Sequence, residues 1–259
     1  MQRLGQHFLK DTSVLEKIAA AIDIAPTDIV VEIGPGHGEL TEHILKFGPE
    51  KIIAIERDEK LATSLREQVT SKSGLEIIRG DALKILPKVP ITYHLKPKTF
   101  KIAGNIPYYI TGKLLRTIGE LKEKPSLTVL TIQKEVAERL CAEPPEMNLL
   151  AASVRFWGEP KIVGTVSRNA FRPRPKVESA IIQIVTRETS ASEEESVKYY
   201  AFIKALFKQP RKTILNNLTD GSNHTKKEVE KFLVSHGVEP KLRPQNLDID
   251  TINNLSQSF

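Results

Sequence analysis

Short apolar runs alternate with amphipathic stretches over the first 190 residues of the chain. The apolar runs have the length of buried strands and end at glycine, proline or acidic positions. They predict strands at residues 28–33, 51–56, 75–78, 100–104, 127–132, 161–166 and 179–185. Apolar positions at helical spacing predict helices at residues 11–23, 39–47, 58–71, 111–121, 134–141 and 147–157. This alternation predicts an α/β fold with a largely parallel sheet, helices on both faces and a late antiparallel edge.

The pattern changes near residue 190, where the polar and acidic residues 187–196 are typical of a linker. The remainder predicts helices only, at residues 197–207, 212–218, 226–236 and 248–256. Gly237 would end the third of these helices as a C-cap residue. We therefore predict two domains, residues 1–189 and residues 190–259, of which the second is small and all-helical.

The charge of the chain is unevenly distributed. The net charge of +6 makes a polyanionic partner plausible, although many proteins are mildly basic. Two windows contain basic residues and no acids: Lys161, Arg168, Arg172, Arg174 and Lys176 in the first, and Lys198, Lys204, Lys208, Arg211 and Lys212 in the second. Such windows favour a surface for phosphates, but a solvated face is the competing interpretation, and for the second window alone it is the better one.

Cys141 is the only cysteine, so no intrachain disulfide can form and a reducing compartment fits. The N-terminal segment lacks an apolar signal core, and no apolar run approaches the roughly 18 residues that a membrane span needs. We therefore expect a cytoplasmic protein without a membrane contact.

A glycine-rich turn, Gly34-Pro35-Gly36-His37-Gly38, separates the first predicted strand from the following helix. Glycines there let a ligand approach the backbone closely, although a tight turn without a ligand would use the same residues. Glu56 ends the next strand, where a carboxylate can take ribose hydroxyls, and Asp81 ends the third, where it can accept from an adenine amino group. Ligand-type groups at three consecutive strand ends predict a nucleoside cofactor, with NAD and S-adenosylmethionine both open.

Asn105-Ile106-Pro107-Tyr108 follows the fourth predicted strand, and Pro107 prevents the continuation of that strand. The side-chain oxygen of Asn105 and the carbonyl of Ile106 or Pro107 can accept both N–H bonds of an exocyclic amine. This favours a pyramidal nitrogen whose lone pair faces a sulfonium methyl, so that catalysis rests on positioning and charge stabilisation without a metal. Tyr108 can stack on the base, a contact worth about 1–3 kcal/mol. The alternative is a strand that ends at a proline beside a core tyrosine.

These residues belong to a larger ordered set. Its members are Gln6-His7-Phe8-Leu9, Glu32-Ile33-Gly34-Pro35-Gly36, Glu56, Gly80-Asp81-Ala82, Asn105-Ile106-Pro107-Tyr108, Gln133-Lys134-Glu135-Val136 and Phe171-Arg172-Pro173-Arg174-Pro175-Lys176-Val177-Glu178-Ser179. In this order the set resembles the rRNA adenine N6-dimethyltransferases, from about residue 3 to at least residue 218. The resemblance implies a Rossmann-like, S-adenosylmethionine-dependent methyltransferase domain, with a seven-stranded mostly parallel sheet, followed by a small helical domain.

The resemblance also implies roles for single residues. By position, Gly34, Glu56, Asp81 and Asn105 match the cofactor contacts of the family, with His7 and Leu9 closing the site from the N-terminal segment. Phe171 matches the aromatic ring that sandwiches the target base opposite Tyr108. The target adenine must leave its stack, at a cost of roughly a few kcal/mol, and the first basic window would hold nearby phosphates. We expect an rRNA partner, no metal and a monomer.

Two branches of the family share these motifs. One modifies two adjacent adenines in a hairpin loop near the 3′ end of small-subunit rRNA, and the other modifies a large-subunit adenine and gives macrolide-type resistance. Residues 209–218, Gln-Pro-Arg-Lys-Thr-Ile-Leu-Asn-Asn-Leu, resemble the segment that opens the C-terminal domain of the small-subunit branch. The sequence therefore favours this branch, with a role in ribosome biogenesis.

The chain departs from the family pattern in places. His7 stands where asparagine is usual, Pro210 stands where arginine is frequent, and the Tyr-Gly pair common after the Gln-Lys-Glu-Val helix is absent around residues 147–149. Three other readings are open: a ribosome-assembly or RNA-binding factor without catalysis, an NAD-dependent oxidoreductase and a DNA adenine methyltransferase. The Asn-Ile-Pro-Tyr segment disfavours the oxidoreductase, and the ordered motif set fits RNA better than DNA.

Overall fold

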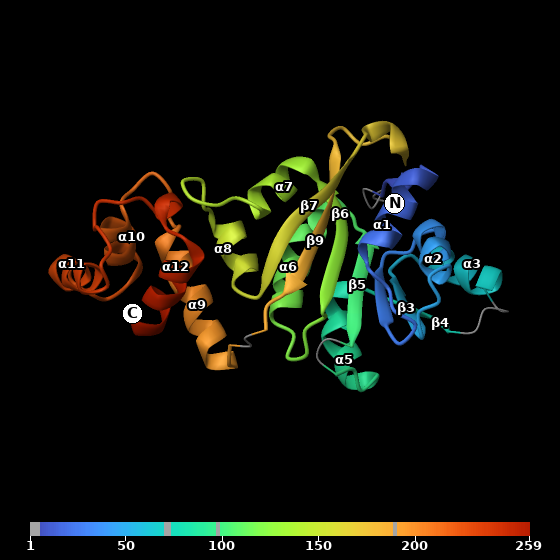
Figure 1. Ribbon diagram of the computed structural model, residues 1–259, viewed down its shortest axis with the longest axis horizontal. Coiled ribbons are helices and arrows are strands. Elements are labelled where there is room, and N and C mark those ends of the chain that lie inside the picture. The colour runs from blue at the N-terminus through green and yellow to red at the C-terminus, as the bar shows by residue number, and fades with distance from the viewer. Residues whose placement is uncertain (1–5, 70–73, 97–98, 189–190) are drawn as a thin grey trace. The chain divides into compact units, whose positions relative to one another are not determined.

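The computed structural model describes residues 6–69, 74–96, 99–188 and 191–259 (Figure 1). Its larger sheet has seven strands in the order β4-β3-β2-β5-β6-β9-β7. They are β2 (Ile29–Ile33), β3 (Lys51–Glu56), β4 (Leu75–Arg79), β5 (Phe100–Asn105), β6 (Leu127–Gln133), β7 (Gly158–Val166) and β9 (Ser179–Thr186). The pairs from β4 to β6 are parallel, whereas β9 runs antiparallel to β6. The predicted α/β fold with a mostly parallel seven-stranded sheet is confirmed.

Helices cover both faces of this sheet. One face carries α1 (Thr12–Ala21), α2 (Glu39–Leu45) and α3 (Glu59–Val69). Apolar side chains of α1 and α2 share a buried cluster with Val30, Ile52 and Val129 of the strands, and α3 packs on Ala54. The segments after β4 and β5 form α4 (Ala82–Ile85), η1 (Leu86–Lys88), α5 (Val89–Thr92), η2 (Tyr108–Ile110) and α6 (Thr111–Gly119). Helix α6 contacts α4 and η1 and lies behind the strands in Figure 1.

A second, two-stranded sheet joins segments that are far apart in the sequence. β1 (Phe8–Leu9) runs antiparallel to β8 (Phe171–Arg172), which follows η3 (Arg168–Ala170), and Leu9 lies opposite Phe171. The amide of Lys10 extends this pairing by donating to the carbonyl of Ala170 at 2.8 Å. Leu9 and Phe171 are buried in the cluster that α1 and α2 share with the sheet. This short sheet therefore anchors the N-terminal segment to the body of the fold.

The contacts divide the chain into two units. Residues 1–138 and 159–186 form the first, which holds both sheets, and residues 139–158 and 187–259 form the second. Helices of the second unit are α8 (Leu149–Arg155), α9 (Glu193–Leu206), α10 (Ile214–Gly221), α11 (Lys226–Ser235) and α12 (Ile249–Ser258), with the short η4 (Pro244–Asn246); α7 (Lys134–Leu140) reaches the division. The predicted domain limit between residues 189 and 190 stays a prediction, and the contacts add residues 139–158 to the second group.

The helical unit has a core of its own. Tyr199, Phe202 and Leu206 of α9 pack with buried residues of α8, α10, α11 and α12. The hydroxyl of Tyr199 donates to the carbonyl of Ala152 at 2.8 Å, which satisfies its one buried polar atom. The prediction of a linker through residue 196 is wrong at its end: Ser192 and Glu195 form a capping box, so α9 already begins at Glu193. In the described part of the chain, none of the helices is long and apolar enough to cross a membrane.

Candidate active site

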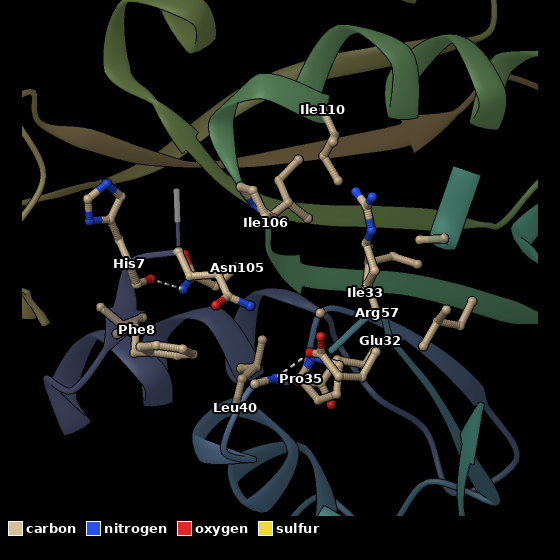
Figure 2. A pocket seen from close by; sticks show the side chains of 18 of the residues that line it. His7, Phe8, Glu32, Ile33, Pro35, Leu40, Arg57, Asn105, Ile106 and Ile110 are labelled. Carbon is tan, nitrogen blue, oxygen red and sulfur yellow. Dashed lines mark hydrogen bonds between the residues drawn. The ribbon is translucent and has the colours of Figure 1, made fainter. Parts of the chain in front are cut away.

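A cavity opens at the carboxyl ends of β2, β3, β4 and β5 (Figure 2). The space between its walls is about 1010 Å³, including the open mouth. The lining comes mainly from residues 6–9, 32–36, 55–57, 80–82 and 105–110. The cavity thus gathers predicted contact residues from the whole first unit: His7, Leu9, Gly34, Gly36, Glu56, Asp81, Asn105, Pro107 and Tyr108. Strand ends of this kind are where open α/β sheets bind ligands.

The strand register brings three polar side chains to the same face of the sheet. Glu32 of β2 pairs with Ala54 of β3 and with Ala103 of β5. Side chains two residues apart on a strand share a face, so Glu56 and Asn105 lie on the same face as Glu32. All three line the cavity at the end of their strands. Parallel pairing of these particular strands is therefore what assembles the polar part of the site.

The glycine turn supplies a backbone wall. Gly34 and Gly36 have φ values of +68° and +61°, in the left-handed region that side-chain-bearing residues rarely adopt. A Cβ atom on Gly36 would lie 3.1 Å from the ring of Phe8, and the Phe8 ring also contacts His37 with a centroid distance of 4.6 Å. The turn and the N-terminal segment are therefore packed so closely that residue 36 must be glycine for Phe8 to stay in place.

The two predicted cofactor acids are held in position by backbone amides. The carboxylate of Glu56 is buried and accepts from the amides of Gly36 at 3.1 Å and Asp58 at 2.8 Å. Asp81 caps α4 by accepting from the amide of Leu83 at 3.0 Å. Each carboxylate oxygen has a second lone pair, so both acids retain acceptor capacity toward the cavity.

Glu32 is a site residue that the site prediction did not single out. Its carboxylate is fully enclosed, accepts from the hydroxyl of Thr41 at 2.7 Å and lines the cavity. The pKa of Glu32 is raised to about 7, mainly by burial; the Thr41 bond opposes this rise, and the nearby Glu56 and Glu39 carboxylates contribute to it. The signal for it was present, because Glu32 opens the motif that continues into the glycine turn.

The side chain of Asn105 is oriented by the N-terminal segment. Its Nδ2 donates to the backbone carbonyl of His7 at 2.9 Å, which is the dashed contact between the two residues in Figure 2. Nδ2 gives one of its two N–H groups to this bond, and Oδ1 is the atom of the amide that can accept from a donor in the cavity. A ligand amine is the kind of group that this oxygen can hold.

Tyr108 forms an aromatic wall beside Asn105. Its hydroxyl is 2.6 Å from Oγ of Ser179, and burial raises the pKa of Tyr108 above its usual range. The imidazole of His7 faces this ring, with the centroids 5.7 Å apart and the planes tilted by 31°. His7 is itself held by Nδ1, which donates to the carbonyl of Pro173 at 2.8 Å. The ring opposite Tyr108 is thus an imidazole from residue 7.

Phe171 does not occupy the position expected from the resemblance. Its side chain is fully buried among apolar residues of the α1–α2 face and is absent from the cavity lining. The pairing of β8 with β1 explains this, because it places Phe171 opposite Leu9, whose side chain points into the same cluster. In this structure Phe171 is a core residue, and its predicted contact with the base would require the ring to leave that core.

The predicted RNA-binding residues lie outside the cavity. Lys161, Arg168, Arg172, Arg174 and Lys176 are all exposed along β7, η3, β8 and the segment that follows. Arg168 donates to the carbonyl of Lys176 at 3.2 Å, and Arg172 donates to that of Phe171 at 2.9 Å, so both guanidinium groups brace this segment. In the helical unit, Arg211 and Lys212 are exposed, and Lys212 pairs with Asp220 at 3.0 Å.

The sequence pattern of the ribosomal RNA adenine dimethylases matches residues 1–259. The chain belongs to this family. It is 40% identical over 248 residues to a ribosomal RNA small subunit methyltransferase A of Dehalococcoides mccartyi (strain CBDB1), over 95% of this chain and 84% of that protein. A protein of the same name from Geobacillus kaustophilus (strain HTA426) is 34% identical over 266 residues, 99% of this chain and 89% of that one.

Solved structures agree with this family membership. A dimethyladenosine transferase from Plasmodium falciparum superposes with a TM-score of 0.81 at 28% identity, over 98% of this chain and 97% of that one. The 23S rRNA methyltransferase ErmE gives a TM-score of 0.74 at 24% identity, over 96% and 98%, and shows the same fold. As a family member, the chain is an rRNA adenine N6-dimethyltransferase that uses S-adenosylmethionine.

The residues of the cavity fit this cofactor. The turn at Gly34 and Gly36 presents backbone without side chains, and no atom within 4 Å would meet a Cβ on Gly34, which leaves open space beside that residue. Two carboxylates at neighbouring strand ends, Glu56 and Asp81, match the hydroxyl and amino donors of an adenosine. The cavity therefore combines a glycine cradle with acceptors for a nucleoside.

Proposed function

We propose that this chain dimethylates N6 of two adjacent adenines in the 3′-terminal hairpin loop of small-subunit rRNA, as part of ribosome biogenesis. The orientation of Asn105, whose Oδ1 is left for a donor in the cavity, is the observation that carries the chemistry. The names of the curated relatives, at 34–40% identity over nearly the whole chain, support the small-subunit substrate. The segment at residues 209–218, with its small-subunit character, supports it as well.

Asn105 would act on the adenine amine by holding its protons. Oδ1 accepts one N6–H bond, and a backbone carbonyl at Ile106 or Pro107 accepts the other, which directs the nitrogen lone pair away from both acceptors. S-adenosylmethionine, when bound, supplies a methyl group on a sulfonium centre. The acceptors stabilise the positive charge that develops on N6. Once alkylated, the cationic nitrogen is acidic and loses its proton to water. Neither a strong base nor a metal is needed for these steps.

The remaining cavity residues would hold the two ligands. We assign Gly34, Gly36, Glu56 and Asp81 to the nucleoside part of the cofactor, and His7 and Leu9 to the segment that covers it. Tyr108 offers a ring on which the target adenine stacks, worth about 1–3 kcal/mol, against a flipping cost of roughly a few kcal/mol. The exposed side chains of Lys161, Arg168, Arg172, Arg174 and Lys176 would bind the flanking phosphates.

The test is methyl transfer from labelled S-adenosylmethionine to undermethylated small subunits, to large subunits and to naked rRNA, followed by mapping of the labelled nucleotides. We expect dimethyladenine at two adjacent positions of the 3′-terminal hairpin of the small subunit. Label in the large subunit would overturn the substrate. Cofactor binding by calorimetry without transfer to any RNA would favour a ribosome-assembly factor without catalysis.

The same experiment bears on where and how the protein works. A substrate in assembling small subunits supports action in the cytoplasm. We infer that the active form is a monomer. Sedimentation of the protein at assay concentration checks this: activity confined to a dimer fraction would overturn it.

A further inference from the structure

The cavity mouth carries an exposed aromatic ring, that of Tyr109. Tyr109 lines the cavity although its side chain is 58% exposed. The other large apolar side chains that are exposed in the described residues lie elsewhere: Phe47, Ile91, Leu149, Val177, Val185, Val197 and Val234 are all absent from the lining. Among the residues that the structure describes, Tyr109 is therefore the one large apolar side chain that is both exposed and part of the cavity wall.

Tyr109 differs in its surroundings from the neighbouring Tyr108. The hydroxyl of Tyr108 bonds to Ser179 and its ring faces His7, so that residue is fixed inside the cavity. Both tyrosines belong to η2, and in a 3₁₀-helix consecutive side chains point about 120° apart from Cα atoms about 3.8 Å apart. The two rings therefore diverge from one stretch of backbone, one within the cavity and one at its mouth.

We propose that Tyr109 stacks on the base next to the target adenine and holds it at the cavity mouth. This inference rests on the proposed function, in which the two target adenines are adjacent. One phosphodiester joins them, so when one base enters the cavity the other remains at its mouth. The neighbour is an unmodified adenine in the first round and a dimethyladenine in the second.

A stacking surface suits a neighbour that is first unmodified and then dimethylated better than a hydrogen-bonding surface does. Dimethylation removes both N6–H donors of adenine but leaves the face of the ring available. Stacking on an aromatic side chain tolerates such changes because every base has a π-face. Tyr109 would thus make the enzyme specific for paired adenines by supporting the neighbour in both rounds, without contacting the reacting atoms.

The test compares Tyr109→Ala with Tyr109→Phe, which keeps the ring, and with Phe47→Ala, which removes an exposed ring away from the cavity. Each variant is assayed on small subunits reconstituted with the natural rRNA hairpin and with a hairpin that is abasic at the neighbour of the target. For Tyr109→Ala on the natural hairpin we expect kcat/KM to fall by roughly five- to 150-fold, the effect of losing one stacked base, mainly through KM. Tyr109→Phe and Phe47→Ala should stay within about twofold of the wild type.

The abasic hairpin separates stacking from a structural role. There the wild type should drop to the level of Tyr109→Ala, and the variant should lose nothing more. A Tyr109→Ala enzyme that matches the wild type on the natural hairpin would overturn the inference. So would an equal loss on both hairpins, or a weaker calorimetric Kd for S-adenosylmethionine in this variant. If the wild type leaves the natural hairpin unmethylated, the proposed function fails first and the inference falls with it.

Discussion

Both polar atoms of the Asn105 side-chain amide, Nδ2 and Oδ1, have a role in the site. Its nitrogen donates to the carbonyl of His7, and its oxygen is the atom of the amide that can accept from a ligand in the cavity that Asn105 lines. The amide therefore links the closure of the N-terminal segment to the position of the acceptor. The sequence predicted the acceptor from a polar residue at a strand end, but it could not predict the contact with His7, which is 98 residues away.

Replacement of Asn105 by alanine should remove methyl transfer and leave the fold intact. We expect kcat to fall by at least about 10²–10³-fold, as for the loss of one group that stabilises transition-state charge. Asn105→Asp is the matched variant, because it keeps an oxygen but loses the donor to His7. Single-turnover methylation measures the effect, and circular dichroism checks the fold. Full activity of Asn105→Ala would remove the assigned role.

Glu32 should make the stability of the protein depend on pH. Burial raises the pKa of Glu32 from an ordinary 4.5 to about 7, so folding takes up a proton between these values. The stabilisation from this proton is complete below about pH 4.5 and is lost as the pH rises through 7. Because a tenfold change in proton affinity is worth about 1.4 kcal/mol, the loss is of the order of 3 kcal/mol.

Urea unfolding of the wild type and of Glu32→Gln between pH 5 and pH 8 checks this prediction. Glutamine can still accept from Thr41 but carries no charge, so the free energy of unfolding of the variant should decline less with rising pH. Parallel pH profiles for the two proteins would show that Glu32 titrates normally in the folded state.

Individual elements were predictable where the sequence pattern is long enough to show a period. The strand predicted at residues 127–132 is β6 (Leu127–Gln133), and the helix predicted at residues 226–236 is α11 (Lys226–Ser235). β1 and β8 were not predicted, because two residues show no alternation and their pairing joins positions more than 160 residues apart. The burial of Phe171 follows from that pairing, which the sequence does not show, and the predicted contact of Phe171 with the base stays a prediction.

Phe171→Ala distinguishes a core residue from a base-stacking one. A fully buried phenylalanine that loses its ring leaves a cavity, so we expect the free energy of unfolding to fall by about 3–5 kcal/mol. Denaturant unfolding measures this loss, and Phe171→Leu, which keeps most of the apolar volume, should lose less. Unchanged stability combined with weaker RNA binding would instead return Phe171 to the wall of the base pocket.

For the molecule as a whole, the alternation of strands and helices predicted the class of fold but not the order of the strands. The two late strands do lie at one edge of the sheet. The later strand, β9, lies between β6 and β7, and β7 is the edge strand. No local pattern specifies which of two late strands takes the inner position. Charge distribution, in contrast, was readable directly, since every basic residue of the first window is exposed.

The salt dependence of RNA binding should report the phosphate contacts of this surface. Arg174 is exposed, and its replacement by alanine should reduce the slope of log K against log salt by about 0.7–0.9 if it neutralises one phosphate. Lys122→Ala is the control. Lys122 is exposed in the segment that leads into the amino end of β6, whereas the cavity lies at the carboxyl ends of the parallel strands. Filter binding at several salt concentrations measures both slopes. Equal slopes for Arg174→Ala and the wild type would exclude this phosphate contact.

The pairing of β1 with β8 has a consequence for the order in which the protein is built on the ribosome. The hydrogen bond of His7 needs the carbonyl of Pro173, which is synthesised 166 residues later. The hydrogen bond of Tyr108 needs Ser179, which is synthesised 71 residues later. At about 5–20 residues per second, synthesis separates His7 from Pro173 by roughly 10–30 s. The glycine turn and the strand ends can form early, but the N-terminal segment that closes the cavity cannot be fixed in place before β8 is made. A nascent chain therefore acquires its methyl-transfer site only after Pro173 and Ser179 have emerged, so this rRNA methyltransferase cannot have a complete site before the last strands of its sheet are made.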